Sequence, residues 1–182
     1  NYNGKIDFFN HHQCHLASTF YSSGFEDPLL VSYDGCGEID TMAMGIFENG
    51  EIVTKVNSNQ YPNSLGLLYS AITNYLGWQY ACDEGIVMGL ASIGDPYAKV
   101  PNTDVSYIDV FRKSVFNKGN FEYYLKMPKL LNFYEERDVW VGNEFFKLMG
   151  PKRKKNDKIT EHHSNIAAGL QLRLEEIILE QL

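Results

Sequence analysis

Apolar and polar positions in the first third of the chain follow the pattern of β-strands. Three runs are either continuously apolar or alternate between apolar and polar residues: 29–34, 41–48 and 51–57. Asn49-Gly50, which separates the last two runs, is a strong signal for a two-residue hairpin. The pattern therefore predicts a three-stranded antiparallel meander, and a further short strand is expected over 5–9.

Helical spacing of apolar residues marks most of the remaining elements. Helices are predicted over 11–22 and 65–76, and a short helix or turn over 84–91. A last amphipathic helix begins at His162-His163, whose rings we expect on the surface. Residues 108–116 fit a helix or a strand, and 121–125 fit a strand. The mixture predicts an α/β protein, α+β within this chain, with helices packed on the meander. The many aromatic residues between 111 and 146 are expected to fill a core rather than to form a pocket for a base.

Composition narrows the class of protein. The chain has 182 residues, of which 44% are hydrophobic and 21% charged, as in a folded globular protein. Its net charge of -7 argues against a nucleic-acid partner, which requires clustered Lys and Arg. No apolar run is long enough to cross a bilayer and no signal peptide begins the sequence, so we expect a cytoplasmic protein with no membrane partner.

The cysteines and the basic run have simple interpretations. Cys14, Cys36 and Cys82 are an odd number without zinc-site spacing, so they are predicted to be reduced thiols, with Cys14 a small buried residue. The run 151–155, Pro-Lys-Arg-Lys-Lys, is expected to be a solvated loop, and guidance of a phosphorylated substrate is the alternative.

Candidate metal chemistry lies at the start of the chain. His11 and His15 are one helical turn apart, so their imidazoles can hold one divalent cation between them. The strand that follows ends in Asp34-Gly35-Cys36-Gly37, which offers a carboxylate as third ligand and glycine backbone for a phosphate. Surface histidines and an ordinary Asp-Gly turn are the structural alternative, but the combination favours a metal or nucleotide site.

A second anion position is conceivable where the helix over 65–76 begins. Ser64 and the Gly66 backbone could bind an anion there, with plain helix capping as the favoured alternative.

Motifs along nearly the whole chain resemble one family. They are His11-His12-x-x-His15-x-Ala17-Ser18-x-Phe20-Tyr21, Asp34-Gly35-x-Gly37-Glu38, Pro62-x-Ser64-Leu65-Gly66-x-Leu68-Tyr69, Glu84-x-x-Val87-Met88-Gly89-Leu90-Ala91-x-x-Gly94 and Ile166-Ala167-Ala168-x-Leu170-Gln171. In this order they resemble the NodU/CmcH-type carbamoyltransferases, which are related to the hydrogenase-maturation carbamoyltransferase and the tRNA threonylcarbamoyl transferases.

The resemblance implies an actin-like ATPase fold of the ASKHA kind, built from ribonuclease-H-like halves. It also implies that carbamoyl phosphate and ATP form carbamoyl adenylate in a separate domain, and that the carbamoyl group then moves to a hydroxyl of a small-molecule acceptor. The chain is expected to be a central segment, residues 1–182 forming one partial domain, with the rest of the ASKHA domain and the adenylate-forming domain outside it. A second copy of the chain, forming a homodimer, is a further candidate partner.

The resemblance assigns the metal ligands by position, and the other site residues are expected from their own chemistry. A divalent metal, often iron, with zinc and manganese also suited to such ligands, would be held by His11, His15 and Asp34 and would grip the adenylate phosphate. Asp34, Gly35 and Gly37, with Ser64 and Gly66, would bind the nucleotide, ATP or carbamoyl adenylate. His12 is the candidate for proton transfer with substrate, and support of the neighbouring histidines is the equal alternative.

Two competing functions remain. The alternative to the enzyme is a non-catalytic nucleotide-binding module that keeps the actin-like fold, to which Ile86 points because this family usually has lysine there. A metalloprotease is disfavoured because His12 occupies the place of the glutamate that would follow the first histidine.

Overall fold

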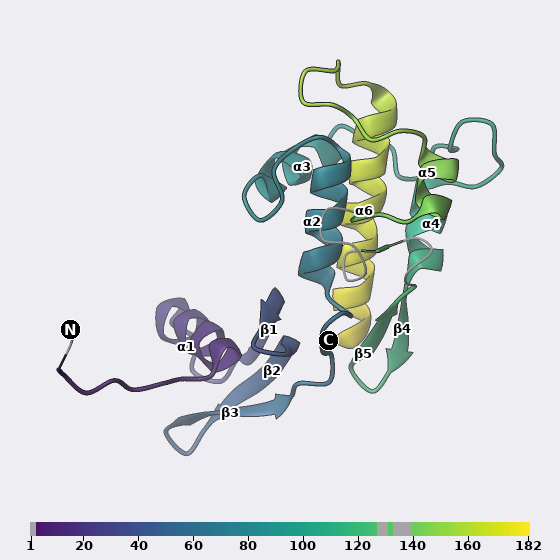
Figure 1. The fold of residues 1–182 in the computed structure, drawn as a ribbon. Helices are drawn as coiled ribbons and strands as arrows, with labels where there is room; N and C mark the ends of the chain where they lie inside the picture. Colours follow the sequence, from purple (N-terminus) through teal and green to yellow (C-terminus); the bar gives the residue numbers. More distant parts are fainter. Residues whose placement is uncertain (1–2, 127–130, 133–139) are drawn as a thin grey trace. The chain divides into compact units, whose positions relative to one another are not determined.

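A computed structural model describes residues 3–126, 131–132 and 140–182 (Figure 1). The chain forms two compact units, Asn1–Ser64 and Leu65–Leu182. The boundary coincides with the predicted start of the helix after Ser64, although no shift in composition marks it. Part of the aromatic-rich stretch, including Phe133 and Tyr134, lies outside the described residues.

The first unit contains helix α1 (His11–Ser23) and strands β1 (Leu29–Gly37), β2 (Asp40–Glu48) and β3 (Glu51–Val56) (Figure 1). The strands form one antiparallel sheet in the order β1-β2-β3, which confirms the predicted meander. Asn49 and Gly50 have φ angles of 53° and 84°, as a hairpin turn with two left-handed residues requires.

Helix α1 is fixed at both ends and along one face. The Asn10 side chain accepts a hydrogen bond from the Gln13 N–H, and Gly24 ends the helix at a φ of 74°. Leu16 packs with Leu30 and Ala43 of the sheet. This packing positions the histidine-bearing face of the helix.

Two predictions for the first unit are wrong. Residues 5–9 form no strand, because no strand of the described chain pairs with them, and Phe8 and Phe9 are exposed. Cys14 is exposed rather than buried. The buried face of α1 carries His12 and Leu16, and Cys14, two residues from each of them, points to the opposite side of the helix. All three cysteines are free, as predicted.

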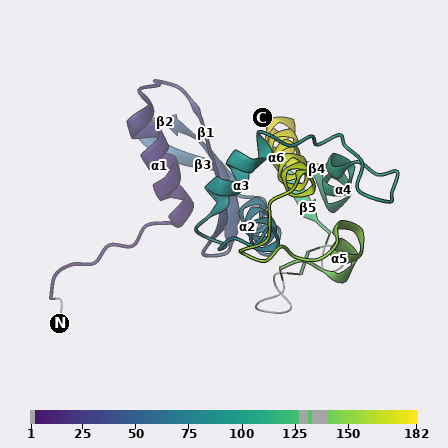
Figure 2. The ribbon, with the colours of Figure 1, turned by 90° about the horizontal axis from the view of Figure 1, so that it is seen from above.

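The second unit is built around the long helix α6 (Glu161–Gln181). Its other elements are α2 (Leu65–Tyr75), α3 (Glu84–Ala91), α4 (Tyr107–Ser114), β4 (Val115–Gly119), β5 (Glu122–Leu125) and α5 (Asn143–Met149). Figure 2 shows α6 between α4 on one side and α2 and α3 on the other. The stretch 108–116, for which a helix or a strand was predicted, contains the end of a helix and the start of a strand, since α4 ends at Ser114 and β4 begins at Val115. Helix α5 has no counterpart among the predicted elements.

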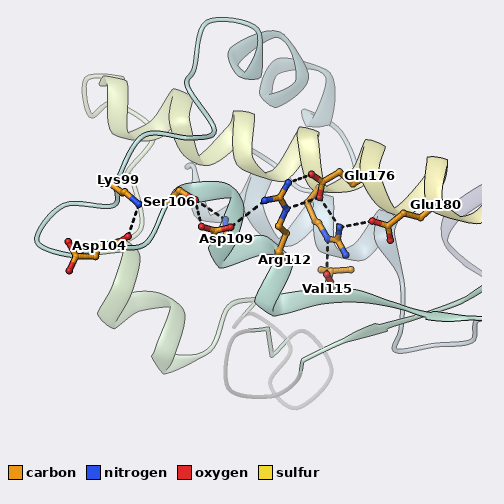
Figure 3. A network of polar contacts seen from close by, with 9 residues as sticks. Lys99, Asp104, Ser106, Asp109, Arg112, Val115, Glu176 and Glu180 are labelled. Atoms are coloured by element: carbon orange, nitrogen blue, oxygen red, sulfur yellow. Dashed lines mark hydrogen bonds and ion pairs between the residues drawn. The ribbon is translucent and has the colours of Figure 1, made fainter.

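An ion pair between Arg112 and Glu176 joins α4 to α6 (Figure 3). The largely buried Arg173 donates from Nε to the Val115 carbonyl at 2.8 Å and from Nη1 to Glu176 at 2.8 Å. Arg112 of α4 donates from Nε to the same Glu176 carboxylate at 3.1 Å. The hydrogen bond from Arg112 lowers the pKa of Glu176, partial burial opposes this, and Arg173 adds to the lowering. Glu176 is therefore an ionised bridge between two guanidinium groups.

The basic run is not fully solvated as predicted. Arg153 is buried, donates to the carbonyl oxygens of Leu76 and Asp157 at 2.6 Å each, and lies 4.5 Å from the Trp78 ring centre. Gly77 makes this possible, because a Cβ there would lie 2.5 Å from the Arg153 carbonyl oxygen. Backbone carbonyls supply the partners of this cation, and no sequence pattern records them.

His162 and His163 are not simply surface residues either. His162 is partly buried, with Nδ1 at 2.5 Å from the Tyr107 hydroxyl and Nε2 at 2.8 Å from the Met149 carbonyl oxygen. His163 Nδ1 accepts the Thr160 N–H at 3.0 Å and so caps α6. Among the described residues, no helix combines the length and the apolar character that a membrane span needs.

The cap at His163 predicts a pH-dependent stability. Partial burial and the neighbouring His162 and Arg153 lower the pKa of His163, while Asp157 opposes the shift. The folded chain therefore binds a proton at His163 less readily than the unfolded chain does. The contribution of neutral His163 to the stability of the fold is complete above about pH 6.5 and declines as the pH falls. Replacing His163→Gln keeps an acceptor and should reduce this decline.

Urea denaturation at several pH values measures the effect through tryptophan fluorescence, because Trp78 and Trp140 both belong to the second unit. Lys158→Gln is the matched control on the exposed loop and should keep the wild-type pH dependence. An unchanged pH dependence in His163→Gln would contradict the assignment.

Candidate metal site

Helix α1 and strand β1 bring three ligand-type side chains together in the first unit. Asp34 Oδ2 lies 2.5 Å from His11 Nε2 and 3.2 Å from His15 Nε2, and the two Nε2 atoms are 3.0 Å apart. Within the part of the chain that the structure describes, these are the one group of three or more His, Cys, Asp or Glu side chains able to share an ion. The sequence predicted these three residues.

Local backbone structure explains why they converge. His11 and His15 share one face of α1 by their i, i+4 spacing. Strand β1 loses its regular pairing with β2 between Tyr33 and Gly37, so Asp34 sits in an irregular part of the ladder. Gly37 lets α1 come close, because a Cβ at that position would lie only 2.2 Å from the His11 ring. Gly37 thus has a packing role, whereas the sequence suggested only contact with a phosphate.

The Asp34 side chain is held in place from several directions. Its Oδ1 accepts the Gly35 N–H at 2.6 Å, and the Ser64 hydroxyl donates to its backbone carbonyl at 2.9 Å. Partial burial disfavours the charged carboxylate, but hydrogen bonds with His11, Gly35 and His15 outweigh this and lower the pKa of Asp34. The carboxylate is therefore ionised and already oriented toward the histidines.

This donor set fits a divalent metal. Ligand atoms at about 2.0–2.2 Å from one ion lie about 3.0–3.5 Å from each other, and the two contacts of His15 fall in that range. His11 Nε2 and Asp34 Oδ2 are closer together than two ligands of one ion, so they would have to move apart slightly when an ion binds. The three side chains are between 35% and 49% exposed, so an ion can reach them from solvent. Three protein ligands also leave coordination positions for a further group.

His12 has a different environment from its neighbours. It is buried, with Nδ1 at 2.9 Å from the Ser32 hydroxyl and Nε2 at 3.0 Å from the Asp40 carbonyl oxygen. Because a carbonyl only accepts, Nε2 carries the hydrogen and Nδ1 accepts from Ser32. Both nitrogens have partners within the unit, which favours the supporting role over proton transfer with substrate.

The remaining predicted residues are Ser64 in the first unit and Gly66 in the second. Ser64 is buried against Asp34, and its hydroxyl is used there. Gly66 belongs to α2 in the other unit, where the preceding Leu65 N–H donates to the Tyr123 hydroxyl at 3.3 Å. The amide of the residue before Gly66, whose backbone was predicted to bind an anion, is thus already occupied.

Sequence reasoning missed Ser32, although a signal for it exists. Ser32 follows Leu30 on the same face of β1, and both are buried. A small polar residue on the inner face of a strand needs a hydrogen-bond partner, and His12 provides it.

Taken together, the first unit is a helix on an antiparallel meander that presents a two-histidine, one-carboxylate cluster. Comparison with known proteins gives the family. Residues 2–182 match the family described as carbamoyltransferase N-terminus, so the chain belongs to that family, and the predicted relationship to carbamoyltransferases is confirmed.

Several curated proteins are similar to this chain. It is 32% identical over 180 residues to nodulation protein NolNO of Sinorhizobium fredii, covering 98% of this chain and 23% of that protein. It is 32% identical over 179 residues to nodulation protein NolO of Bradyrhizobium diazoefficiens, covering 95% and 28%. An uncharacterized protein of Synechocystis is 30% identical over 174 residues, covering 94% and 26%. The chain spans about a quarter of the length of these relatives.

The contact between Ser32 and His12 predicts a local loss of stability. Ser32→Ala would leave a buried ring nitrogen without its donor, at a cost of about 1–3 kcal/mol. The first unit contains neither tryptophan, so fluorescence does not report on its unfolding. Amide hydrogen exchange of the first unit is therefore the suitable measurement. Ser22→Ala, at the exposed end of α1, should leave protection unchanged. Equal protection in the two variants would contradict the role of Ser32.

Proposed function

We propose that this chain is the part of an O-carbamoyltransferase that binds a divalent metal through His11, His15 and Asp34. Through that ion it would hold the phosphate of carbamoyl adenylate while the carbamoyl group moves to an acceptor hydroxyl. The observation that carries the proposal is the convergence of these three side chains in a member of the carbamoyltransferase family.

The residues suit this task in charge and position. Two imidazoles and one carboxylate give a donor set with a single negative charge, which leaves a divalent ion enough positive charge to attract a phosphate. When bound, the metal would neutralise charge on the phosphate and make AMP a better leaving group. His11 and His15 offer their Nε2 atoms, the Gly35 N–H orients the Asp34 carboxylate toward them, and Ser64 holds the Asp34 backbone carbonyl.

The transfer itself needs few groups. The acceptor oxygen forms a bond to the carbamoyl carbon, the bond from that carbon to the phosphate oxygen of AMP breaks, and the hydroxyl proton leaves to solvent. Holding the adenylate in one orientation supplies much of the rate enhancement in such a reaction. Nitrogen and carboxylate ligands suit iron, zinc and manganese alike.

We also propose that the first unit is part of a ribonuclease-H-like half of an ASKHA fold. An antiparallel β1-β2-β3 meander with a helix packed on it is compatible with that fold, and the family membership supports it.

A non-catalytic nucleotide-binding module is the second candidate. The observation that favours it is Ile86, which is half-exposed on α3 at the position where the resembling family usually has lysine. A surface cation available to a nucleotide is absent at that place.

Metal binding is the first test. The full-length protein, loaded anaerobically with ferrous iron or zinc and desalted, should retain about one metal per chain by elemental analysis. His11→Ala and His15→Ala should each lower metal affinity at least about tenfold, since each removes one ligand. Cys14→Ala removes an exposed thiol from the same helix and should retain the metal. Metal absent from the wild type, or retained equally by all variants, would overturn the site.

Turnover is the second test and separates the two candidates. The full-length enzyme should release AMP from ATP only when carbamoyl phosphate is present, and Asp34→Asn should reduce this release at least about 100-fold because it removes the anionic ligand. Asp27→Asn, an exposed acidic residue of the same unit, is the matched control and should keep wild-type activity. Nucleotide binding without AMP release for any hydroxyl acceptor would instead favour the non-catalytic module.

A further inference from the structure

A groove on the second unit lies between helices α3 and α6. Its volume is about 470 Å³, and Figure 2 shows the two helices next to each other. Helix α3 and the segment after it form one wall of the groove, and α6 forms the other. Apolar and aromatic residues make up most of the lining: Met88, Ala91, Pro96, Tyr97, Ala168 and Leu172.

Large apolar side chains are exposed along α3 and the segment that follows it. The exposed fractions are 47% for Ile86, 58% for Met88, 76% for Ile93 and 63% for Tyr97. Single exposed apolar side chains are ordinary on a protein surface, but several of them close together are typical of a contact surface. Because Met88 and Tyr97 also line the groove, the groove and these side chains belong to one surface.

Helix α3 is apolar on its outer side as well as on its inner side. Its one charged side chain, Glu84, is already used, because it accepts from the Ser70 hydroxyl and from the Ala81 N–H at 2.6 Å each. In the described chain, a Cβ added at Gly85 or Gly89 would meet nothing beyond the helix's own backbone within 4 Å. A helix that is apolar all round is normally covered all round, and the outer side of α3 is open.

The polar groups of the groove have partners within the unit. Gln171 accepts from the Tyr69 hydroxyl at 3.0 Å and donates to Glu175 at 2.8 Å. The Ser92 hydroxyl donates to the Gly89 carbonyl oxygen at 2.7 Å. Glu175 is the one charged residue of the lining, and its carboxylate would repel a phosphate. The groove therefore suits an apolar polypeptide segment better than a nucleotide or another polar ligand.

The length of the related proteins indicates where such a segment comes from. The chain covers between 23% and 28% of three curated relatives, so most of the polypeptide in these relatives lies outside the matched region. A segment of the same polypeptide is held near the groove by its covalent connection, at an effective concentration of about millimolar for short linkers. A separate molecule must instead give up its translational and rotational freedom to bind. This difference favours a segment of the same polypeptide over a second copy.

We propose that an apolar segment of the full-length polypeptide, outside residues 1–182, packs into this groove and covers the outer side of α3. A lysine or arginine of that segment lies next to Glu175 and complements its charge. The proposal depends on neither metal binding nor carbamoyl transfer, and it goes beyond the proposed function.

Hydroxyl-radical labelling of the full-length protein, read by mass spectrometry, measures whether the groove is covered. Met88 and Tyr97 should be oxidised at least about fivefold more slowly in the folded protein than in its tryptic peptides, because a packed segment excludes water from them. Met44, which is buried in the sheet, is the reference for a covered methionine. The protection should persist over about a hundredfold dilution, because it needs no second molecule.

Photo-cross-linking then identifies the segment. Tyr97 is replaced by p-benzoylphenylalanine in the full-length protein, which on irradiation should cross-link to residues of the same polypeptide outside 1–182. The same replacement of Lys155, which lies in an exposed polar loop, is the matched control and should give no cross-link to that segment.

Three results would overturn the proposal. Oxidation of Met88 and Tyr97 at the rate of the free peptides would show that the groove is open. Protection that disappears on dilution would assign the groove to a second copy. Cross-links from position 97 to residues 1–64 would assign it to the first unit.

Discussion

The Asp34 carboxylate is the group on which the proposed metal site depends. It is placed by an interruption of the β1-β2 ladder, fixed by Gly35 and Ser64, and faced by two imidazoles one helical turn apart. Its ionised state results from hydrogen bonds that outweigh partial burial. Helix capping at Asn10 and the packing of Leu16 keep α1 over this carboxylate, so they support the proposed site.

Much of this arrangement could be predicted from the sequence, because it depends on local patterns. The i, i+4 spacing of His11 and His15, the Asn49-Gly50 turn and the apolar strands each follow from neighbouring residues. The roles of Gly37 and Ser32 could not be read in the same way, since each is set by a residue at least 20 positions away. A strand over 5–9 was predicted wrongly because pairing depends on a partner rather than on the strand's own residues.

In the second unit, too, the environment of the charged residues could not be predicted from neighbouring residues in the sequence. Arg153 and Arg173 are buried, and each donates to a backbone carbonyl far away in the sequence, that of Leu76 and that of Val115. Charge patterns assign such residues to the surface, and the exceptions occur where a cation satisfies several acceptors at once. Within the basic run 151–155, Arg153 is buried and hydrogen-bonded, while the other residues are exposed.

Gly37 has a consequence for how relatives of this protein are compared. Its missing side chain is what allows the His11 ring to lie against β1. A homologue with a larger residue at this position would retain all three ligand residues in its sequence and yet lack the space that brings them together. The proposed metal site could therefore be lost in evolution without a change in any ligand, and a motif built from ligands alone would overlook the loss.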